Sequence, residues 1–217
     1  MTKTGDAARP TPTIEPVDLA ETWIVYQKPI IIGAIVLAAA ASGVWLWVRS
    51  GQIKEEKATT AFQVAEAAFM SGNQQLAVTE LEKIVTRYKG TVSGTQAAML
   101  IAQAQMEQGK HADAVTGLQA TLGSSPKSLK AGLYALLATA HEGAGHAAEA
   151  AATYGQAADA AEFETDKDMH RMEQARALLS AGDSAGALKL YQAIASRDDS
   201  PFSGEAKVRV GELNTKL

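Results

Sequence analysis

Residues 29–48 form an apolar segment without a single charged side chain. A helix rises about 1.5 Å per residue, so about 20 residues cross the roughly 30 Å hydrocarbon core of a bilayer. Aromatic rings, which favour the headgroup zone, flank the segment: Trp23 and Tyr26 precede it, and Trp45 and Trp47 end it. These features predict one transmembrane helix over residues 29–48, anchored at the interfaces by those four residues.

A signal peptide and a buried core helix are the two alternatives to a transmembrane helix. A signal peptide has a basic start and a short apolar region. Here Glu15, Asp18 and Glu21 precede the segment, and the apolar run continues through Trp47. A core helix of this length without a polar face is uncommon. The sequence therefore favours a membrane anchor.

Small residues within the segment suggest a packing face in the membrane. Ala39 and Gly43 are four residues apart and Gly33 lies one to two turns earlier. This spacing lets two membrane helices approach closely. Alanine and glycine also occur in membrane helices that have no partner, so both interpretations remain open.

The chain before the segment divides into two parts. Residues 1–17 are polar and contain three prolines, which predicts a flexible tail. Residues 18–28 predict a short amphipathic helix at the membrane interface, with Asp18 as its N-cap. We expect Pro29 to interrupt this helix, because proline disfavours the helical conformation of the residue before it.

The remainder of the chain, residues 49–217, is repetitive. Gly72, Gly109, Gly145 and Gly182 are 37, 36 and 37 residues apart. A fixed period of this size is typical of stacked helical hairpins, and glycine can take the left-handed conformation that ends a helix. Three further positions repeat with the glycines: Ala65, Ala102, Ala138 and Ala175 seven residues before; Ala77, Ala114, Ala150 and Ala187 five after; Leu81, Leu118, Tyr154 and Tyr191 nine after.

The predicted fold is all-α. One N-terminal transmembrane helix is followed by an α-solenoid of about four helical hairpins. A C-terminal capping helix over residues 202–217 completes it, with Ser203 as its cap and Val208 and Leu213 facing inward.

The repeat pattern resembles the tetratricopeptide repeat (TPR). It departs from that repeat in its period of 36 to 37 residues rather than 34, and only Pro126 corresponds to the usual closing proline. The whole layout is similar to the ancillary Sec translocon subunit family of single-pass bacterial inner-membrane proteins. The resemblance implies a repeat domain outside the cytoplasm, linked to periplasmic chaperones.

Charge gives conflicting indications of the side of the membrane. Lys28 precedes the apolar segment, whereas Arg49, Lys54 and Lys57 follow it, which on the positive-inside rule favours cytoplasmic repeats. Large domains cross the membrane despite such a small excess, so we follow the resemblance and expect periplasmic repeats, with the cytoplasm as the alternative. The net charge of -4 gives no footprint for nucleic acid.

No sequence motif indicates catalysis. The chain has no cysteine, no phosphate-binding glycine loop and no nucleophile elbow. Its four histidines lack metal-ligand spacing: we expect His111 and His146 to be exposed in turns and His141 to be a hydrogen-bonded core residue. The sequence predicts no enzyme, cofactor, metal or small-molecule substrate.

The first helix of each hairpin is expected to line a concave groove. Every methionine except Met1 falls on the expected groove positions, and methionine suits surfaces that receive varied apolar partners. The same methionines could instead fill gaps in an alanine-rich core. The candidate groove residues are Phe62, Phe69, Met70, Met99, Met106, Met169, Met172 and Arg176.

Two functions follow from this organisation. The first is a membrane-anchored protein–protein interaction module at the Sec translocon that assists exported proteins. The second is a structural subunit that stabilises another large membrane complex, respiratory or photosynthetic. In both, the partners are other proteins and the lipid bilayer.

Overall fold

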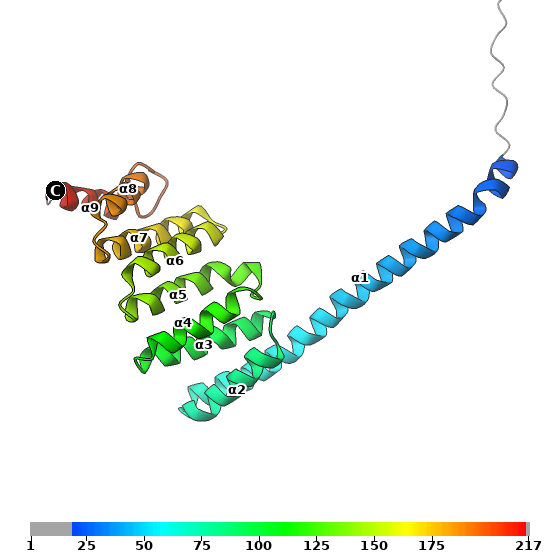
Figure 1. The fold of residues 1–217 in the computed structure, drawn as a ribbon, viewed down its shortest axis with the longest axis horizontal. Helices are drawn as coiled ribbons and strands as arrows, with labels where there is room; N and C mark the ends of the chain where they lie inside the picture. Colours follow the sequence, from blue (N-terminus) through cyan, green and yellow to red (C-terminus); the bar gives the residue numbers. More distant parts are fainter. Residues whose placement is uncertain (1–18, 216–217) are drawn as a thin grey trace, which may run out of the picture. The chain divides into compact units, whose positions relative to one another are not determined.

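The computed structural model of the chain describes residues 19–215, and every regular element among them is helical (Figure 1). No strand occurs in this range, which confirms the all-α fold class. The elements are α1 (Leu19–Met70), α2 (Gln74–Arg87), α3 (Val92–Glu107), α4 (His111–Leu122), η1 (Lys127–Leu129), α5 (Lys130–Gly143), α6 (Ala147–Ala160), α7 (Glu164–Ser180), α8 (Ser184–Ala195) and α9 (Ser203–Asn214).

Helix α1 is a single helix of 52 residues that contains Pro29. The predicted interruption at Pro29 is therefore wrong: residues 19–28 continue into the apolar segment. Proline lacks one N–H donor and its ring crowds the carbonyl four residues earlier, but the hydrogen bonds of the long helix on both sides offset this local cost. The predicted tail over residues 1–17 and the side chains of Trp23 and Tyr26 lie outside the described part of the chain.

Contacts divide the chain into two compact units, residues 1–50 and 51–217. Among the described side chains of the first unit, the apolar ones of residues 31–48 are exposed, including those of Trp45 and Trp47. Among the described residues, α1 is the one helix whose length and composition would suffice to cross a membrane. Within that range nothing approaches Gly33 or Gly43 closely enough to meet an added Cβ.

The second unit consists of four helical hairpins followed by α9. The hairpins pair residues 51–70 of α1 with α2, α3 with α4, α5 with α6, and α7 with α8. Each helix from α2 to α8 packs on the next one along the chain. Figure 1 shows α3 to α8 stacked side by side.

The repeating glycines end the first helices as predicted. Gly72, Gly109, Gly145 and Gly182 have φ between 75° and 86°, a left-handed conformation that L side chains rarely adopt. In each hairpin the residue after the glycine donates its N–H to the carbonyl five residues earlier, the bond of a Schellman motif. A fifth such glycine, Gly90, follows α2 and lies outside the repeat, so the period could not reveal it.

The remaining repeat positions form the core. The eight repeated alanines are at most 2% exposed. Their small side chains let two helix backbones approach closely, and this close packing buries them. Leu81, Leu118, Tyr154 and Tyr191 are at most 4% exposed and fill the space between neighbouring helices. The predicted stack of four hairpins is confirmed.

Helix α9 packs on α8 in a different register from the one expected. Val208 is 60% exposed, whereas Ala206 is fully buried and Val210 and Leu213 pack on the core beside it. Spacings of four and three residues place these inward residues on one helix face. The prediction that Val208 faces inward is wrong, and Ser203 makes no side-chain cap bond.

Candidate protein-binding site

A cavity of about 330 Å³ opens between α7, α8 and α9. Met169, Met172 and Arg176, three of the candidate groove residues, line it together with Leu179 of the same helix. The other lining residues are Glu173, Tyr191, Phe202, Glu205, Arg209, Glu212 and Leu213. The structure therefore brings the groove positions of the fourth hairpin into one concave site.

The base of this cavity is apolar. Met172 is 9% exposed and belongs to a core cluster with Tyr191 and Ala206, and Phe202 and Leu213 pack against that cluster. Met169, one helical turn away, is 40% exposed. The cavity thus joins a buried methionine to one that solvent or a partner can reach.

Charged side chains in opposite pairs surround the apolar base. Arg176 forms ion pairs with Glu142 at 3.0 Å and Glu173 at 2.7 Å. Burial lowers the pKa of Arg176, but hydrogen bonds to these two carboxylates outweigh it and raise the pKa, so the guanidinium stays charged. Arg209 pairs in the same way with Glu205 and Glu212 at 3.8 and 3.1 Å.

In the third hairpin, α5 and α6 carry a polar network. The Tyr154 hydroxyl donates to Glu142 at 3.2 Å and lies 3.2 Å from the Thr139 hydroxyl. Arg176 then links Glu142 to α7. This network ties α5, α6 and α7 together beside the cavity.

Met99 and Met106 are half-buried and pack against the core cluster of α3, α4 and α5. The Met99 methyl group lies 3.7 Å from the position that a Cβ on Gly132 would take, so this side chain fills the space that glycine leaves on α5. For Met99 and Met106 the gap-filling interpretation describes the geometry better than an open groove.

The first hairpin supplies the remaining candidates, which lie apart from the cavity at α7–α9. Phe62 is half-buried against the cluster formed by Ala65 and Leu81, and Phe69 is half-buried near the end of α1. Met70 is 81% exposed. Of the eight candidate groove residues, three line the cavity and five do not.

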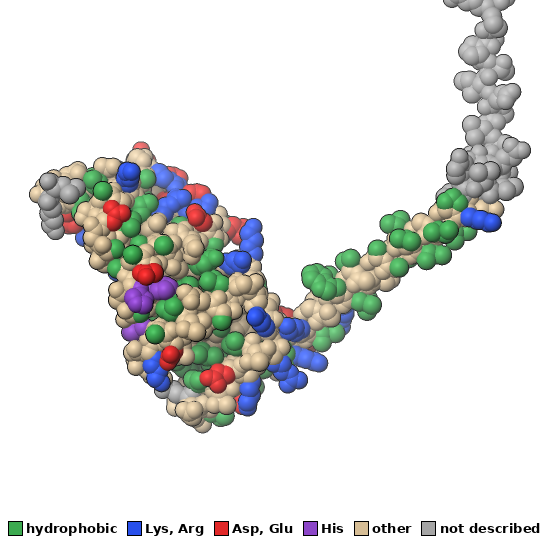
Figure 2. Space-filling model, in the orientation of Figure 1, with side chains coloured by type: hydrophobic (Ala, Val, Ile, Leu, Met, Phe, Trp, Pro, Cys, Tyr) green, Lys and Arg blue, Asp and Glu red, His purple; other side chains and the backbone are tan. Residues whose placement is uncertain are grey.

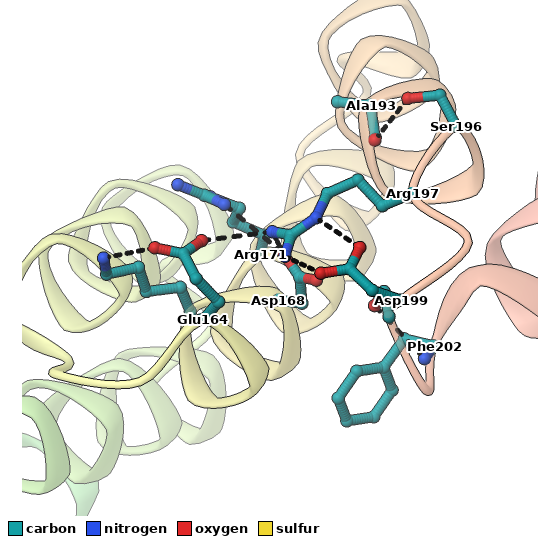
Figure 3. Close-up of polar contacts among 10 residues, drawn as sticks. Glu164, Asp168, Arg171, Ala193, Ser196, Arg197, Asp199 and Phe202 are labelled. Carbon is teal, nitrogen blue, oxygen red and sulfur yellow. Dashed lines mark hydrogen bonds and ion pairs between the residues drawn. The ribbon is translucent and has the colours of Figure 1, made fainter.

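A buried ion-pair cluster that no sequence motif predicted holds the loop after α8 (Figure 3). Asp168 is fully buried and accepts hydrogen bonds from Arg197 at 3.0 Å and Arg171 at 3.3 Å. Arg197 also pairs with Glu164 at 3.1 Å and Asp199 at 3.2 Å. These contacts fix the loop that leads into α9, the helix that supplies one wall of the cavity. The acidic start of α7 was the one signal available in the sequence.

Two histidines differ from expectation. His141 is buried, but its Nδ1 has no hydrogen-bond partner among the described residues. His111 is half-buried rather than exposed, because its ring packs against Gly143. His146 is exposed as expected, with its ring centroid 6.0 Å from that of His141. Within residues 19–215 no three side chains of His, Cys, Asp or Glu are grouped to hold a metal ion.

Four stacked hairpins with glycine-terminated first helices define the class of this protein as an α-solenoid of TPR-like hairpins. The tetratricopeptide repeat-like domain matches residues 21–133, more than half of the chain, and the protein belongs to that family. TPR-like repeats indicate a protein–protein interaction module whose partners are other proteins.

Solved structures share the fold. A crystal structure of nearly identical TPR-like repeats, named for a putative kinesin light chain of Podospora anserina, is 17% identical with a TM-score of 0.57. The match covers 74% of this chain and 87% of the Podospora anserina chain. A single-substitution variant of the same repeats gives 17% identity, a TM-score of 0.56, and coverage of 74% and 86%. No curated protein matches the chain.

Proposed function

We propose that the protein is a membrane-anchored, non-enzymatic interaction module whose cavity at α7–α9 receives an apolar side chain of an extended polypeptide segment. The anchor lies in a bacterial inner membrane, and the repeats face the periplasm. There the module assists exported proteins at the Sec translocon. The single observation that carries the proposal is the cavity itself, where Met169 and Met172 meet inside a ring of paired charges.

The chemistry of the cavity suits a polypeptide. Its volume of about 330 Å³ is at the lower end of ligand-binding sites, and an apolar base binds an apolar side chain. Methionine side chains adjust to differently shaped partners, which suits binding of varied sequences. The carboxylates and guanidinium groups around the base can hydrogen-bond the N–H and C=O groups of an extended backbone.

Two observations support the membrane anchor. The apolar side chains of residues 31–48 are exposed within the chain, and a run of this length needs an apolar environment. The family match begins at residue 21, so the apolar segment and the first repeats fall within one family domain. A signal peptide is cleaved from the mature protein and would not be expected to be part of such a domain.

A structural subunit of another large membrane complex is the second candidate. Gly33 and Gly43 have open space around them within the described residues, as does the face of α1 that carries Ala39. A neighbouring membrane helix could pack there. In that case the span, rather than the cavity, would make the main contact.

Photocrosslinking in cells tests the first candidate. A photoreactive amino acid replaces Met169, at the cavity, in the full chain; a matched variant carries it at Lys189, an exposed position on α8 that does not line the cavity. We expect crosslinks to Sec subunits and exported chains at Met169 and few at Lys189. Equal crosslinking at both positions would overturn the proposal, and one stoichiometric complex in mild detergent would favour the second candidate.

The side of the membrane is tested separately. The chain contains no cysteine, so a single cysteine at Ala148, an exposed position on α6, reports accessibility without background. Labelling of intact cells, after the outer membrane is permeabilised, by a reagent that cannot cross the inner membrane is the expected result. Labelling only after lysis would assign the repeats to the cytoplasm.

A further inference from the structure

Two segments far apart in the sequence meet at one end of the repeat unit. The Lys54 ammonium group of α1 donates a hydrogen bond to the backbone carbonyl of Lys89 at 2.6 Å. Close by, the hydroxyl groups of Thr59 and Ser93 lie 3.0 Å apart. The start of the first hairpin and the turn between α2 and α3 therefore form one surface.

One carboxylate of this surface is directed inward. Glu55 accepts hydrogen bonds from the backbone N–H groups of Val92 and Ser93 at 2.7 and 2.9 Å, and from the Ser93 hydroxyl at 2.8 Å. Burial tends to raise the pKa of Glu55, but these bonds outweigh it and hold the pKa below its ordinary value. The negative charge compensates the N-terminus of α3, and the carboxylate forms no ion pair with a lysine or arginine of the described residues.

The side chains that remain exposed there are mostly basic. Lys54, Lys57, Arg87 and Lys89 are all exposed, and none forms an ion pair within residues 19–215. Glu56 is the one other carboxylate in residues 51–59 and 84–95. Figure 2 shows Lys and Arg side chains gathered over α2 and the neighbouring part of α1.

Cations near the C-terminus are used differently. Arg171, Arg176, Arg197 and Arg209 each form at least one ion pair with a carboxylate. In contrast to these arginines, Lys54, Lys57, Arg87 and Lys89 are clustered and form no ion pair within the described residues. Such a surface is complementary to an anionic partner.

We propose that Lys54, Lys57, Arg87 and Lys89 form a basic surface that binds the anionic phospholipid headgroups of the membrane. The inference rests on the proposed membrane anchor. Lys54 and Lys57 follow Val48, the last residue of the apolar segment, by only six and nine residues of sequence. Long lysine side chains this close along the chain to a membrane span reach the headgroup zone, where polybasic segments attract anionic lipids within roughly 10 Å.

Headgroup contact is measured on the full chain in lipid nanodiscs. A single cysteine at Thr86, an exposed position on α2 next to Arg87, carries a fluorophore, and a nitroxide on trace lipid headgroups quenches it. One set of nanodiscs contains phosphatidylcholine alone and the other adds phosphatidylglycerol. We expect quenching to rise about twofold or more with phosphatidylglycerol. It should fall back at about 0.5 M salt, where screening shortens the reach of surface charges.

Charge variants assign the effect to these residues. In K54Q/K57Q/R87Q/K89Q the phosphatidylglycerol dependence should disappear. A control with the same loss of four charges, K110Q/K127Q/K130Q/K189Q, should keep it. The double variant K57Q/K89Q leaves the Lys54 hydrogen bond to the Lys89 carbonyl in place and should lose about half of the effect, so the result does not depend on the quadruple variant folding.

Flotation with vesicles at high salt separates this proposal from the anchor. If the chain floats but quenching is equal with and without phosphatidylglycerol, the basic surface is overturned and the anchor stands. The same holds if the control variant loses the phosphatidylglycerol dependence as fully as K54Q/K57Q/R87Q/K89Q does. Failure to float would overturn the anchor. The same labelled chain would then be mixed with phosphatidylglycerol vesicles at low salt. Quenching that is lost in K54Q/K57Q/R87Q/K89Q would support the basic surface, and no such quenching would overturn it.

Discussion

Glu55 receives hydrogen bonds from both the backbone N–H and the hydroxyl of Ser93, at 2.9 and 2.8 Å, across 38 positions of sequence. Through these bonds the first helix of the first hairpin caps the first helix of the second. A capping residue usually belongs to the helix that it caps. Thr91 caps α3 in this way by accepting from the Gly94 N–H, and Glu55 adds a second cap from the neighbouring repeat that links the two hairpins.

Glu55→Gln should lower the free energy of unfolding by about 1–2 kcal/mol, because an amide oxygen replaces a carboxylate that accepts three hydrogen bonds at a helix N-terminus. Urea unfolding of the full chain in detergent measures the change. Glu56→Gln, an exposed neighbour, is the control and should change little. Equal losses in the two variants would contradict the capping role.

Asp168→Asn should destabilise the fourth hairpin by about 1–3 kcal/mol, because two guanidinium groups lose a fully buried anionic partner. The loop into α9 should loosen first, and hydrogen exchange of α9 amides reports it. Asp199→Asn alters an exposed partner of Arg197 and should leave α9 protection nearly unchanged. Unchanged α9 exchange in both variants would mean that α9 docks without this cluster.

Met172→Ala and Met169→Ala should separate stability from binding. Met172 is 9% exposed within a core cluster, so its truncation should cost about 2–4 kcal/mol. Met169 is 40% exposed, so its truncation should leave stability nearly unchanged and weaken peptide crosslinking near the cavity. Crosslinking that persists in Met169→Ala would indicate that the cavity side chains serve packing alone.

The repeat unit should lose stability in mild acid. Burial lowers the pKa of His141 below the ordinary 6.5, Glu149 partly opposes this, and His146 lowers the pKa further. Burial also lowers the pKa of His170, and Asp166 and Glu173 partly oppose it. The unfolded chain therefore binds more protons than the folded one as the pH falls below 6.5. Stability is fully present above that pH and declines below it towards the folded-state pKa values.

Thermal unfolding followed between about pH 7 and pH 5 measures this dependence. His141→Gln combined with His170→Gln should flatten the profile. His146→Gln, which alters an exposed ring, should keep most of the slope. A profile that is equally steep in the double variant would assign the acid sensitivity to other groups.

Local signals in the sequence were sufficient for the hairpin stack. A glycine that ends each first helix, buried alanines at fixed offsets and a large apolar residue nine positions later each act within one hairpin or between neighbours. Such short-range requirements repeat with the chain, so the period exposes them. The predicted break at Pro29 does not occur, because the long helix around it offsets the local preference of proline. The predicted inward direction of Val208 is wrong, because packing against α8 determines which face of α9 is buried.

The sequence by itself determined that the chain is helical, that it carries one long apolar segment and that four hairpins stack, because periodicity and hydropathy act over short stretches of chain. Only the tertiary structure decided which methionines line a cavity and which fill the core, and that Glu55 caps α3 while four nearby cations stay unpaired. These outcomes depend on side chains that meet across 29 to 38 positions of sequence, and no local pattern fixes the angle at which such residues approach one another.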